Sequence, residues 1–446
     1  MQSLEWRYVR DTHPRKEVMK LMKRFLYCLA GVLCLVLLLG GATLADEMTW
    51  AELQAAIFGA ANGATITLTS QVSANVNHSD TALVIPSGKN ITLDLNGNLL
   101  WRNTIGTDPS ATGSVIQVKQ GATLTIVDSV GGGRIAGGSA YNGGGIYNQG
   151  TLTLNGVWIG GDRASLANKT SFGGAGVYNG ETGTVTISGG RVEHNTVTGD
   201  FGGGGLYNLG TMYLTDVTVA NNTAKSYGGG IFNGRSGVLY LGGKVVVTGN
   251  TVSGAVNNLA LFENTLLRAS SALDADARIG VNLASTTVKE STAFTTGFAG
   301  MGPAACFVPD DSALAAGLNA SGEVQLGAPV TLTLNAGEGT GTMSAIRVAK
   351  NSVVALPECA YTAPAGKSFF AWQIGSDAAN RKAPGETVTL SANETAIAIW
   401  QSDWQKLQQQ IDEAGDGATI TLTESVLAVE GDVALVIPRA RRSPSI

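Results

Sequence analysis

Gly143–Asn148, with the sequence GGGIYN, is the first of four copies of one motif, in which a glycine corner leads into an aliphatic residue, an aromatic residue and an asparagine. The other copies are Gly173–Asn179 (GGAGVYN), Gly203–Asn208 (GGGLYN) and Gly228–Asn233 (GGGIFN). Each copy is followed by a turn and then by a segment with period-two alternation, such as Thr151–Leu154, which is typical of a half-buried strand. The recurrence indicates a repeat protein in which one unit stacks on the next.

Each repeat offers three short strands and no helical pattern between them. We therefore predict an all-β fold, a single-stranded right-handed parallel β-helix (solenoid) in which each strand lies about 4.8 Å from its counterpart in the next coil. The glycine runs fit corners that need a positive φ or a close backbone approach. Similar alternation at 64–68, 91–97 and 123–127 predicts that the coils begin near residue 64, within a unit spanning 46–265.

The recurring asparagines are Asn148, Asn179, Asn208 and Asn233. Side-chain amides at equivalent positions of stacked strands can hydrogen-bond along the stack, so these residues predict a structural Asn ladder. The alternative interpretation is a row of amides that binds a ligand.

A short helix is predicted to cover the open N-terminal end of the solenoid, because such ends need a cap. Thr49 and Glu52 have the spacing of a capping box, and Trp50, Leu53 and Ile57 follow on one helical face. We expect this face to lie over the first coil. Trp50 could instead be an exposed ring that binds a sugar.

Residues 19–45 are predicted to be a signal peptide. Lys20, Lys23 and Arg24 precede an apolar run, and the small residue Ala45 precedes Asp46, which predicts cleavage between them. An uncleaved anchor helix is the alternative. Residues 1–18 are interpreted as an extension upstream of the signal, either untranslated or translated. Export places the protein outside a bacterial cell, secreted or on the surface.

Two segments follow the repeats. Residues 266–328 are expected to form irregular terminal coils and a linker. Residues 329–400 carry Gly337 and Gly339, a Phe369–Trp372 strand, Pro384-Gly385-Glu386 and Trp400. This pattern resembles the internalin B-repeat family, also called the Listeria–Bacteroides repeat, although Glu338 stands where the family usually has a second glycine. The resemblance implies a small β-rich, ubiquitin-like stalk module of bacterial surface proteins. Phe369, Trp372 and Trp400 are expected to form its core, with an aromatic carbohydrate platform as the alternative.

Residues 401–446 repeat the beginning of the solenoid unit. Trp50–Gln54, Gly63–Thr69 and Leu83–Pro86 recur as Trp404–Gln408, Gly417–Thr423 and Leu435–Pro438. We interpret this stretch as a truncated restart of a second capping helix and β-helix. The alternative for the residues after Pro438 is a natural basic tail.

The glycine-rich motifs also resemble the polymorphic outer-membrane protein repeats of chlamydial autotransporters, with the best match at residues 221–232. Gly230 replaces the alanine of that family's pattern. The resemblance implies an adhesin with a β-helical passenger.

An enzyme is the rival interpretation, because parallel β-helices often bind or cleave polysaccharides. A pectate-lyase-like site needs several aspartates for Ca²⁺ with a basic residue beside them. The repeats offer Asp162, Asp200, Asp216, Arg163, Arg191, Arg235 and His194. Asp162 and Asp200 follow glycines near the ends of coils and could come within reach of each other, but solvated turn residues are the simpler interpretation of all of them.

The amino-acid composition excludes some classes of protein and of partner. Glycine supplies 60 of 446 residues while charged residues make up 14%, which argues against a disordered linker protein. A net charge of −5 and a pI of 5.4 argue against a nucleic-acid partner. Cys306 and Cys359 could form a disulfide after export or stay unpaired.

We expect an exported, adhesin-like, non-catalytic display or binding protein without a cofactor or metal. Its partner would be a host or bacterial surface ligand, with a glycan among the candidates. Contact with a membrane is expected only through the signal peptide or an anchor outside this sequence. The alternative is a polysaccharide-binding or polysaccharide-degrading, pectate-lyase-like β-helix.

Overall fold

The fold is taken from a computed structural model of the chain. The described residues are 47–75, 80–104, 109–110, 113–263, 265–282, 292–301, 304–415 and 417–438. The predicted signal peptide, with Ala45 and Asp46 at its cleavage site, lies outside these residues.

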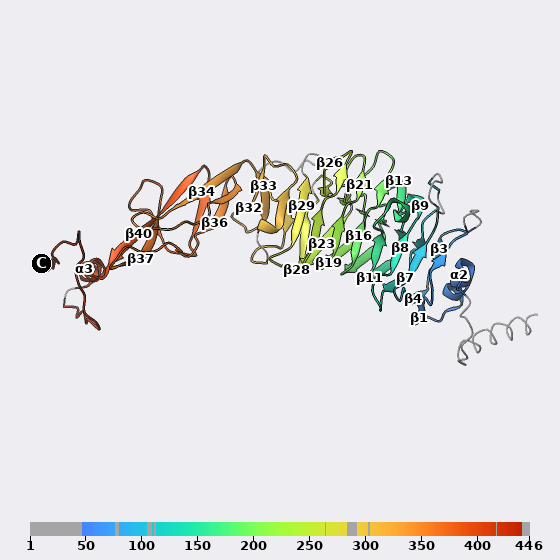
Figure 1. Cartoon of the computed structure of the whole chain (residues 1–446), viewed down its shortest axis with the longest axis horizontal. Coiled ribbons are helices and arrows are strands. Elements are labelled where there is room, and N and C mark those ends of the chain that lie inside the picture. Colours follow the sequence, from blue (N-terminus) through green and yellow to red (C-terminus); the bar gives the residue numbers. More distant parts are fainter. Residues whose placement is uncertain are drawn as a thin grey trace, which may run out of the picture. The chain divides into compact units, whose positions relative to one another are not determined.

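The predicted fold class is confirmed: the chain forms a parallel β-solenoid of about eight turns with an N-terminal helix, followed by a β-rich C-terminal region (Figure 1). The alternating strands of successive coils build a nine-stranded parallel sheet. Its strands are β1 (Ala64–Thr67), β4 (Asn90–Asp94), β7 (Thr123–Val127), β11 (Thr151–Asn155), β15 (Thr184–Ser188), β19 (Thr211–Thr215), β23 (Val238–Gly243), β28 (Leu267–Leu273) and β30 (Thr295–Thr296).

Two further stacks join into one 16-stranded sheet, because β29 pairs with strands of both. One stack contains β2 (Val72–Ser73), β5 (Leu99–Trp101), β8 (Arg134–Ala136), β12 (Trp158–Gly160), β16 (Arg191–Glu193), β20 (Thr218–Ala220), β24 (Val246–Thr248) and β29 (Arg278–Asn282). The other contains β3 (Leu83–Ile85), β6 (Ile116–Val118), β10 (Ile146–Asn148), β14 (Val177–Asn179), β18 (Leu206–Asn208), β22 (Ile231–Asn233) and β27 (Leu259–Leu261), and β31 (Phe307–Pro309) pairs with β29.

A fourth strand occurs in several coils, so the expectation of three strands per repeat was wrong for this part of the solenoid. These strands form a six-stranded sheet. They are β9 (Ser139–Asn142), β13 (Lys169–Gly173), β17 (Thr196–Val197), β21 (Thr223–Ala224), β25 (Thr251–Val252) and β26 (Ala255–Val256), and the 3₁₀ turn η1 (Ala164–Leu166) precedes β13. Four of these strands have only two residues, too few to show an alternation in the sequence. The last pair, β25 and β26, is antiparallel.

The solenoid core is a set of apolar columns, because identical registers repeat from coil to coil. Leu152 pairs with Val185 and Leu154 pairs with Ile187, and all four side chains are at most 2% exposed. One glycine in each copy of the motif has a positive φ, for example +69° at Gly203, as expected for a tight corner.

Helix α2 (Trp50–Gly59) begins at the N-cap Thr49, whose side chain and that of Glu52 form the capping box. Trp50, Leu53 and Ile57 are at most 4% exposed and belong to the solenoid core cluster. The Trp50 indole donates a 2.9 Å hydrogen bond to the carbonyl of Thr81. Trp50 is therefore placed in the cap and not as an exposed ring.

The described residues of the stretch 266–328 are more regular than expected. Strands β28 to β31 continue the solenoid pairing, with the 3₁₀ turn η2 (Ala304–Cys306) before β31. The hairpin β32 (Ala315–Leu318) and β33 (Val324–Gly327) then joins β36 (Ser352–Ala355) and β39 (Thr387–Leu390) in a four-stranded antiparallel sheet. These coils lack the glycine-asparagine motif, which is why their regularity does not show in the sequence.

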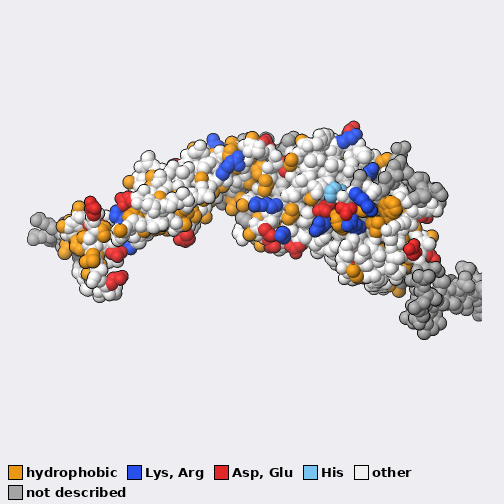
Figure 2. Space-filling view, in the orientation of Figure 1, with side chains coloured by type: hydrophobic (Ala, Val, Ile, Leu, Met, Phe, Trp, Pro, Cys, Tyr) orange, Lys and Arg blue, Asp and Glu red, His pale blue; other side chains and the backbone are white. Residues whose placement is uncertain are grey.

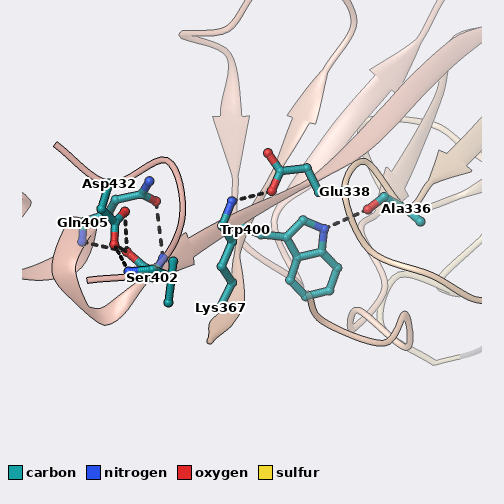
Figure 3. Close-up of polar contacts among 8 residues, drawn as sticks. Ala336, Glu338, Lys367, Trp400, Ser402, Gln405 and Asp432 are labelled. Atoms are coloured by element: carbon teal, nitrogen blue, oxygen red, sulfur yellow. Dashed lines mark hydrogen bonds and ion pairs between the residues drawn. The ribbon is translucent and has the colours of Figure 1, made fainter. Parts of the chain in front are cut away.

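The C-terminal β-rich region also contains a five-stranded mixed sheet, in the order β35 (Ile346–Ala349), β34 (Pro329–Asn335), β40 (Glu394–Ser402), β37 (Lys367–Ile374) and β38 (Arg381–Lys382). Trp372 and Trp400 are 0% and 7% exposed, and Phe369 packs against both rings. The Trp400 indole donates to the carbonyl of Ala336, and Glu338 forms an ion pair with Lys367 (Figure 3). Trp372 and Trp400 thus lie in the interior of this region, and Phe369 is partly buried against them.

Helix α3 (Asp403–Glu413) follows β40 directly. Its N-cap Ser402 forms a capping box with Gln405 and donates from its hydroxyl to Asp432 (Figure 3). Cys306 is buried and Cys359 half-buried, and both thiols are free. Among the described residues, no helix combines the length and apolar character needed to cross a membrane.

Candidate functional site

The predicted asparagines form a continuous internal ladder. Each Nδ2 donates to the Oδ1 of the asparagine in the next coil at 2.8 Å, from Asn148 through Asn179 and Asn208 to Asn233. All four side chains are fully buried. Because the amides face one another inside the solenoid, the structure places them as packing elements and not as a row exposed to a ligand.

A second asparagine ladder was not anticipated from the sequence. It runs through Asn168, Asn195, Asn222, Asn250 and Asn258, with side-chain hydrogen bonds of 2.9 to 3.0 Å. The signal was present in Asn-Thr pairs, because Asn195, Asn222 and Asn250 each precede a threonine and lie 27 and 28 residues apart. The pattern is weak because no aromatic residue or glycine run marks these positions.

The second ladder ends on the carboxylate of Asp310. Asn258 donates to it from its backbone N–H and from its Nδ2, each at 2.6 Å. Burial raises the pKa of Asp310, while the two hydrogen bonds from Asn258 oppose that shift. Asp310 also lines a cavity of about 470 Å³ with Arg278, Val256 and Val308.

Asp310→Asn is expected to change how stability depends on pH. A raised pKa means that the folded chain binds the proton of Asp310 more tightly than the unfolded chain does. The stability that this proton contributes is therefore fully present below the pKa of the unfolded state, and it is lost as the pH rises through the pKa of the folded state. The wild type should therefore lose more stability than the variant between about pH 4 and neutrality. Urea unfolding across this range measures the difference, and parallel pH profiles of the two proteins would contradict it.

Aromatic side chains form a column beside the first ladder. Tyr147, Tyr178, Tyr207 and Phe232 lie in successive coils with ring centroids 5.1 to 5.5 Å apart. Tyr178, Tyr207 and Phe232 are less than 10% exposed, so most of the column is covered. Burial accordingly raises the pKa of Tyr178 and Tyr207. These rings stabilise the stack and leave little surface for a ligand.

Charged and aromatic groups meet on the solenoid in the Arg–Trp–Arg cluster, formed by Arg134, Trp158 and Arg191. The three residues occupy equivalent positions of β8, β12 and β16. The guanidinium carbons of Arg134 and Arg191 lie 3.9 and 5.5 Å from the centroid of the Trp158 ring. Figure 2 shows basic and acidic side chains gathered beside a histidine on the solenoid.

Acidic residues pair with both arginines of the cluster. Asp162 lies 3.2 Å from Arg134, and this hydrogen-bonded guanidinium lowers the pKa of the Asp162 carboxyl. Glu193 lies 3.9 Å from Arg191 and is almost completely buried. Asp162 was among the candidate residues, and the structure joins it to Arg134, which the sequence did not single out.

The other candidate side chains are placed separately. Asp216 has a φ of +54° and accepts from the backbone N–H of Lys244 at 2.8 Å, so it holds a turn. Asp200 is exposed between β17 and β18, and Arg235 lies over the ring of Phe262. His194 has a φ of +58°, and its buried Nδ1 has no hydrogen-bond partner in the described part of the chain. No three His, Cys, Asp or Glu side chains among the described residues are grouped to hold a metal ion.

The outward face of the nine-stranded sheet carries columns of hydroxyl groups. Thr65, Thr92, Thr125, Thr153 and Thr186 lie in register on β1, β4, β7, β11 and β15. The same column continues as Tyr213 and Tyr240, whose rings stack 4.6 Å apart. A parallel column on β7, β11, β15 and β19 contains Thr123, Thr151, Thr184 and Thr211. We call this face the threonine face. β-Branched threonines have few χ1 rotamers, so each side chain in these columns has little conformational freedom.

Comparisons of the chain with family models, curated proteins and solved structures found no match.

Proposed function

We propose that this chain is an exported bacterial surface or secreted protein that uses its β-solenoid to display a binding surface and catalyses no reaction. Lys20, Lys23 and Arg24, followed by the apolar run and Ala45, support export. The threonine face supports binding, and it is the observation on which the proposal mainly rests. Its ligand would be a surface glycan, because rows of hydroxyl groups can donate to and accept from sugar hydroxyls.

The regular spacing of the side chains on the threonine face favours a binding surface over a face that contacts only solvent. Side chains that already have few conformations lose little conformational entropy when a ligand binds to them. The columns also repeat about every 4.8 Å, so a linear polymer can make the same contact several times and gain affinity through multivalency. This arrangement suits an extended glycan better than a small molecule.

Thr125→Val, Thr153→Val and Thr186→Val combined should weaken glycan binding at least about tenfold, which corresponds to 1.4 kcal/mol. Valine keeps the β-branched shape and strand propensity but removes each hydroxyl. Binding of the exported chain to arrays of host and bacterial glycans provides the measurement. Thr218→Val, on β20 of a different sheet, is the matched control and should bind like the wild type.

Unchanged binding by the triple variant would contradict the role of the threonine face, and the absence of any glycan ligand would contradict the proposed ligand class. A polysaccharide-degrading enzyme is the second candidate, favoured by the exposed Asp162 carboxylate that Arg134 holds beside Trp158. That candidate requires release of reducing ends from pectins or host glycans, abolished by Asp162→Ala or Asp200→Ala. The proposed binding protein releases none.

A further inference from the structure

The two ends of the described chain carry the same structural unit, which we call the N-terminal cap (residues 49–85) and the C-terminal cap (residues 402–437). Trp404 donates to the carbonyl of Val433 at 2.7 Å, as Trp50 does to that of Thr81 at 2.9 Å. Gln408 exchanges two hydrogen bonds with the backbone of Val436, at 2.8 and 2.7 Å. Gln54 makes the same pair with Val84, at 3.1 and 2.6 Å. The C-terminal cap therefore reproduces the folded contacts of the N-terminal cap as well as its sequence.

The N-terminal cap shows what such a unit covers. Its strands β1 and β3 pair in parallel with β4 and β6 of the next coil. The apolar side chains between cap and coil are removed from solvent, and Leu68 and Ile85 are 0% and 1% exposed. The helix contributes Trp50, Leu53 and Ile57 to the same core. The partner of the cap is thus one coil of parallel strands with inward aliphatic residues.

The C-terminal cap presents the same surface uncovered. Leu422 and Ile437, the equivalents of Leu68 and Ile85, are 54% and 81% exposed. Helix α3 contains no buried residue, although Leu407 and Ile411 correspond to Leu53 and Ile57. The segments 418–421 and 435–437 match β1 and β3 in sequence but are not strands. Exposed apolar residues and unpaired strand-forming backbone in one place are typical of an interaction surface.

We propose that the C-terminal cap is a docking surface for a coil of a parallel β-solenoid, of the sequence type of residues 90–118. The docked coil pairs its strands in parallel with residues 418–421 and 435–437, and covers Leu422 and Ile437 with its own aliphatic residues. The N-terminal coil of this chain is not available to it, because its own cap occupies it and an exchange would expose as much surface as it covers. The occupant is a coil that has no cap of its own.

The test replaces residues 438–446 with a copy of residues 86–328, because Pro438 corresponds to Pro86; we call the product the extended chain. Hydrogen exchange read by mass spectrometry reports the amides of 418–421 and 435–437. We expect these amides to exchange at least about 100-fold more slowly in the extended chain than in the original chain, since they would belong to a folded sheet. Leu422→Asp with Ile437→Asp in the extended chain should remove this protection and leave the first solenoid unchanged.

A second extended chain carries residues 48–328, so the added coils bring their own cap. If the added coils fold in this second chain but not in the first, the C-terminal cap does not bind a coil and the proposal is overturned. It is also overturned if the coils of the first extension fold while the cap amides exchange as in the original chain. Concentration-dependent protection of the cap in the original chain, with dimers in light scattering, would show a second cap as its partner and contradict the proposed coil.

Discussion

Asn222→Ala is expected to lower the free energy of unfolding of the solenoid by about 3 kcal/mol or more. The Asn222 amide accepts from Asn195 Nδ2 and N–H, and donates to Asn250 Oδ1 and to the carbonyl of Val192. Every one of these groups is buried, and a buried polar group that loses its hydrogen-bond partner costs free energy. Removing one amide in the middle of the ladder therefore leaves several polar groups unsatisfied at once.

Asn221→Gly is the matched control for this substitution. Asn221 precedes the ladder residue, and its φ of +56° suits glycine. We expect its stability to stay within about 0.5 kcal/mol of wild type. Urea unfolding gives both values, and exchange of the amides in β20 and β24 shows whether the loss is local, as a stack of nearest-neighbour coils predicts. Equal stability of Asn222→Ala and Asn221→Gly would contradict a stabilising ladder.

Gly204→Ala is expected to have the second large effect, because the corner of one coil lies directly against the next. A Cβ at Gly204 would lie 2.1 Å from the carbonyl oxygen of Gly229 and 2.6 Å from that of Thr223. Both obstacles are backbone atoms, one in strand β21 and the other in the glycine corner before β22, so the coils must separate to admit a methyl group. We expect a loss of roughly 3 kcal/mol or more, in the range of the more severe overpacking substitutions.

Gly59→Ala provides the comparison for this steric prediction. Gly59 ends helix α2, and a Cβ there meets nothing within 4 Å. Alanine is the better helix former, so this variant should match or slightly exceed the wild-type stability. The midpoint of thermal unfolding ranks the two variants. If Gly204→Ala has the same midpoint of thermal unfolding as the wild type, the close approach of the corners does not limit the stability of the solenoid.

The parallel stack could be predicted from the sequence because the glycine-asparagine motif marks the same point of each coil. The alternation in Thr151–Leu154 and its equivalents then fixes which side chains face inward. The capping box of Thr49 and Glu52 likewise specifies where α2 begins. In each case the residues that carry the signal lie within six or seven positions of one another. The corner, strand or capping contact that they form involves those same residues.

Features that depend on contacts between coils could not be predicted in the same way. The second ladder uses Asn195, Asn222 and Asn250, which carry no local pattern beyond the following threonine. Four of the six strands in the six-stranded sheet have only two residues, which is too few to show a period. Their order comes from pairing with the coil before and after, which a single repeat does not reveal.

The candidate site likewise depends on contacts between coils that the sequence does not show. Asp162 was recognised as a charged residue near the end of a coil, but its partner Arg134 lies one coil earlier, and Trp158 between Arg134 and Arg191 was read as part of a strand. Which residues from different coils meet depends on unequal loop lengths, since the first ladder's asparagines are 31, 29 and 25 residues apart. The threonine columns could be inferred only once the register of all coils was known.

Disulfide trapping of neighbouring coils tests most directly the register on which the ladders and the threonine face depend. In a chain without its other cysteines, Thr153→Cys with Thr186→Cys places two thiols on paired residues of β11 and β15. Adjacent strands are about 4.8 Å apart, within the range of about 4.4–6.8 Å that a disulfide spans between Cα atoms. Thr125→Cys with Thr186→Cys places them two strands apart. The stacked solenoid predicts rapid oxidation of the first pair and free thiols in the second; free thiols in the first pair, or equal oxidation of both, would contradict it.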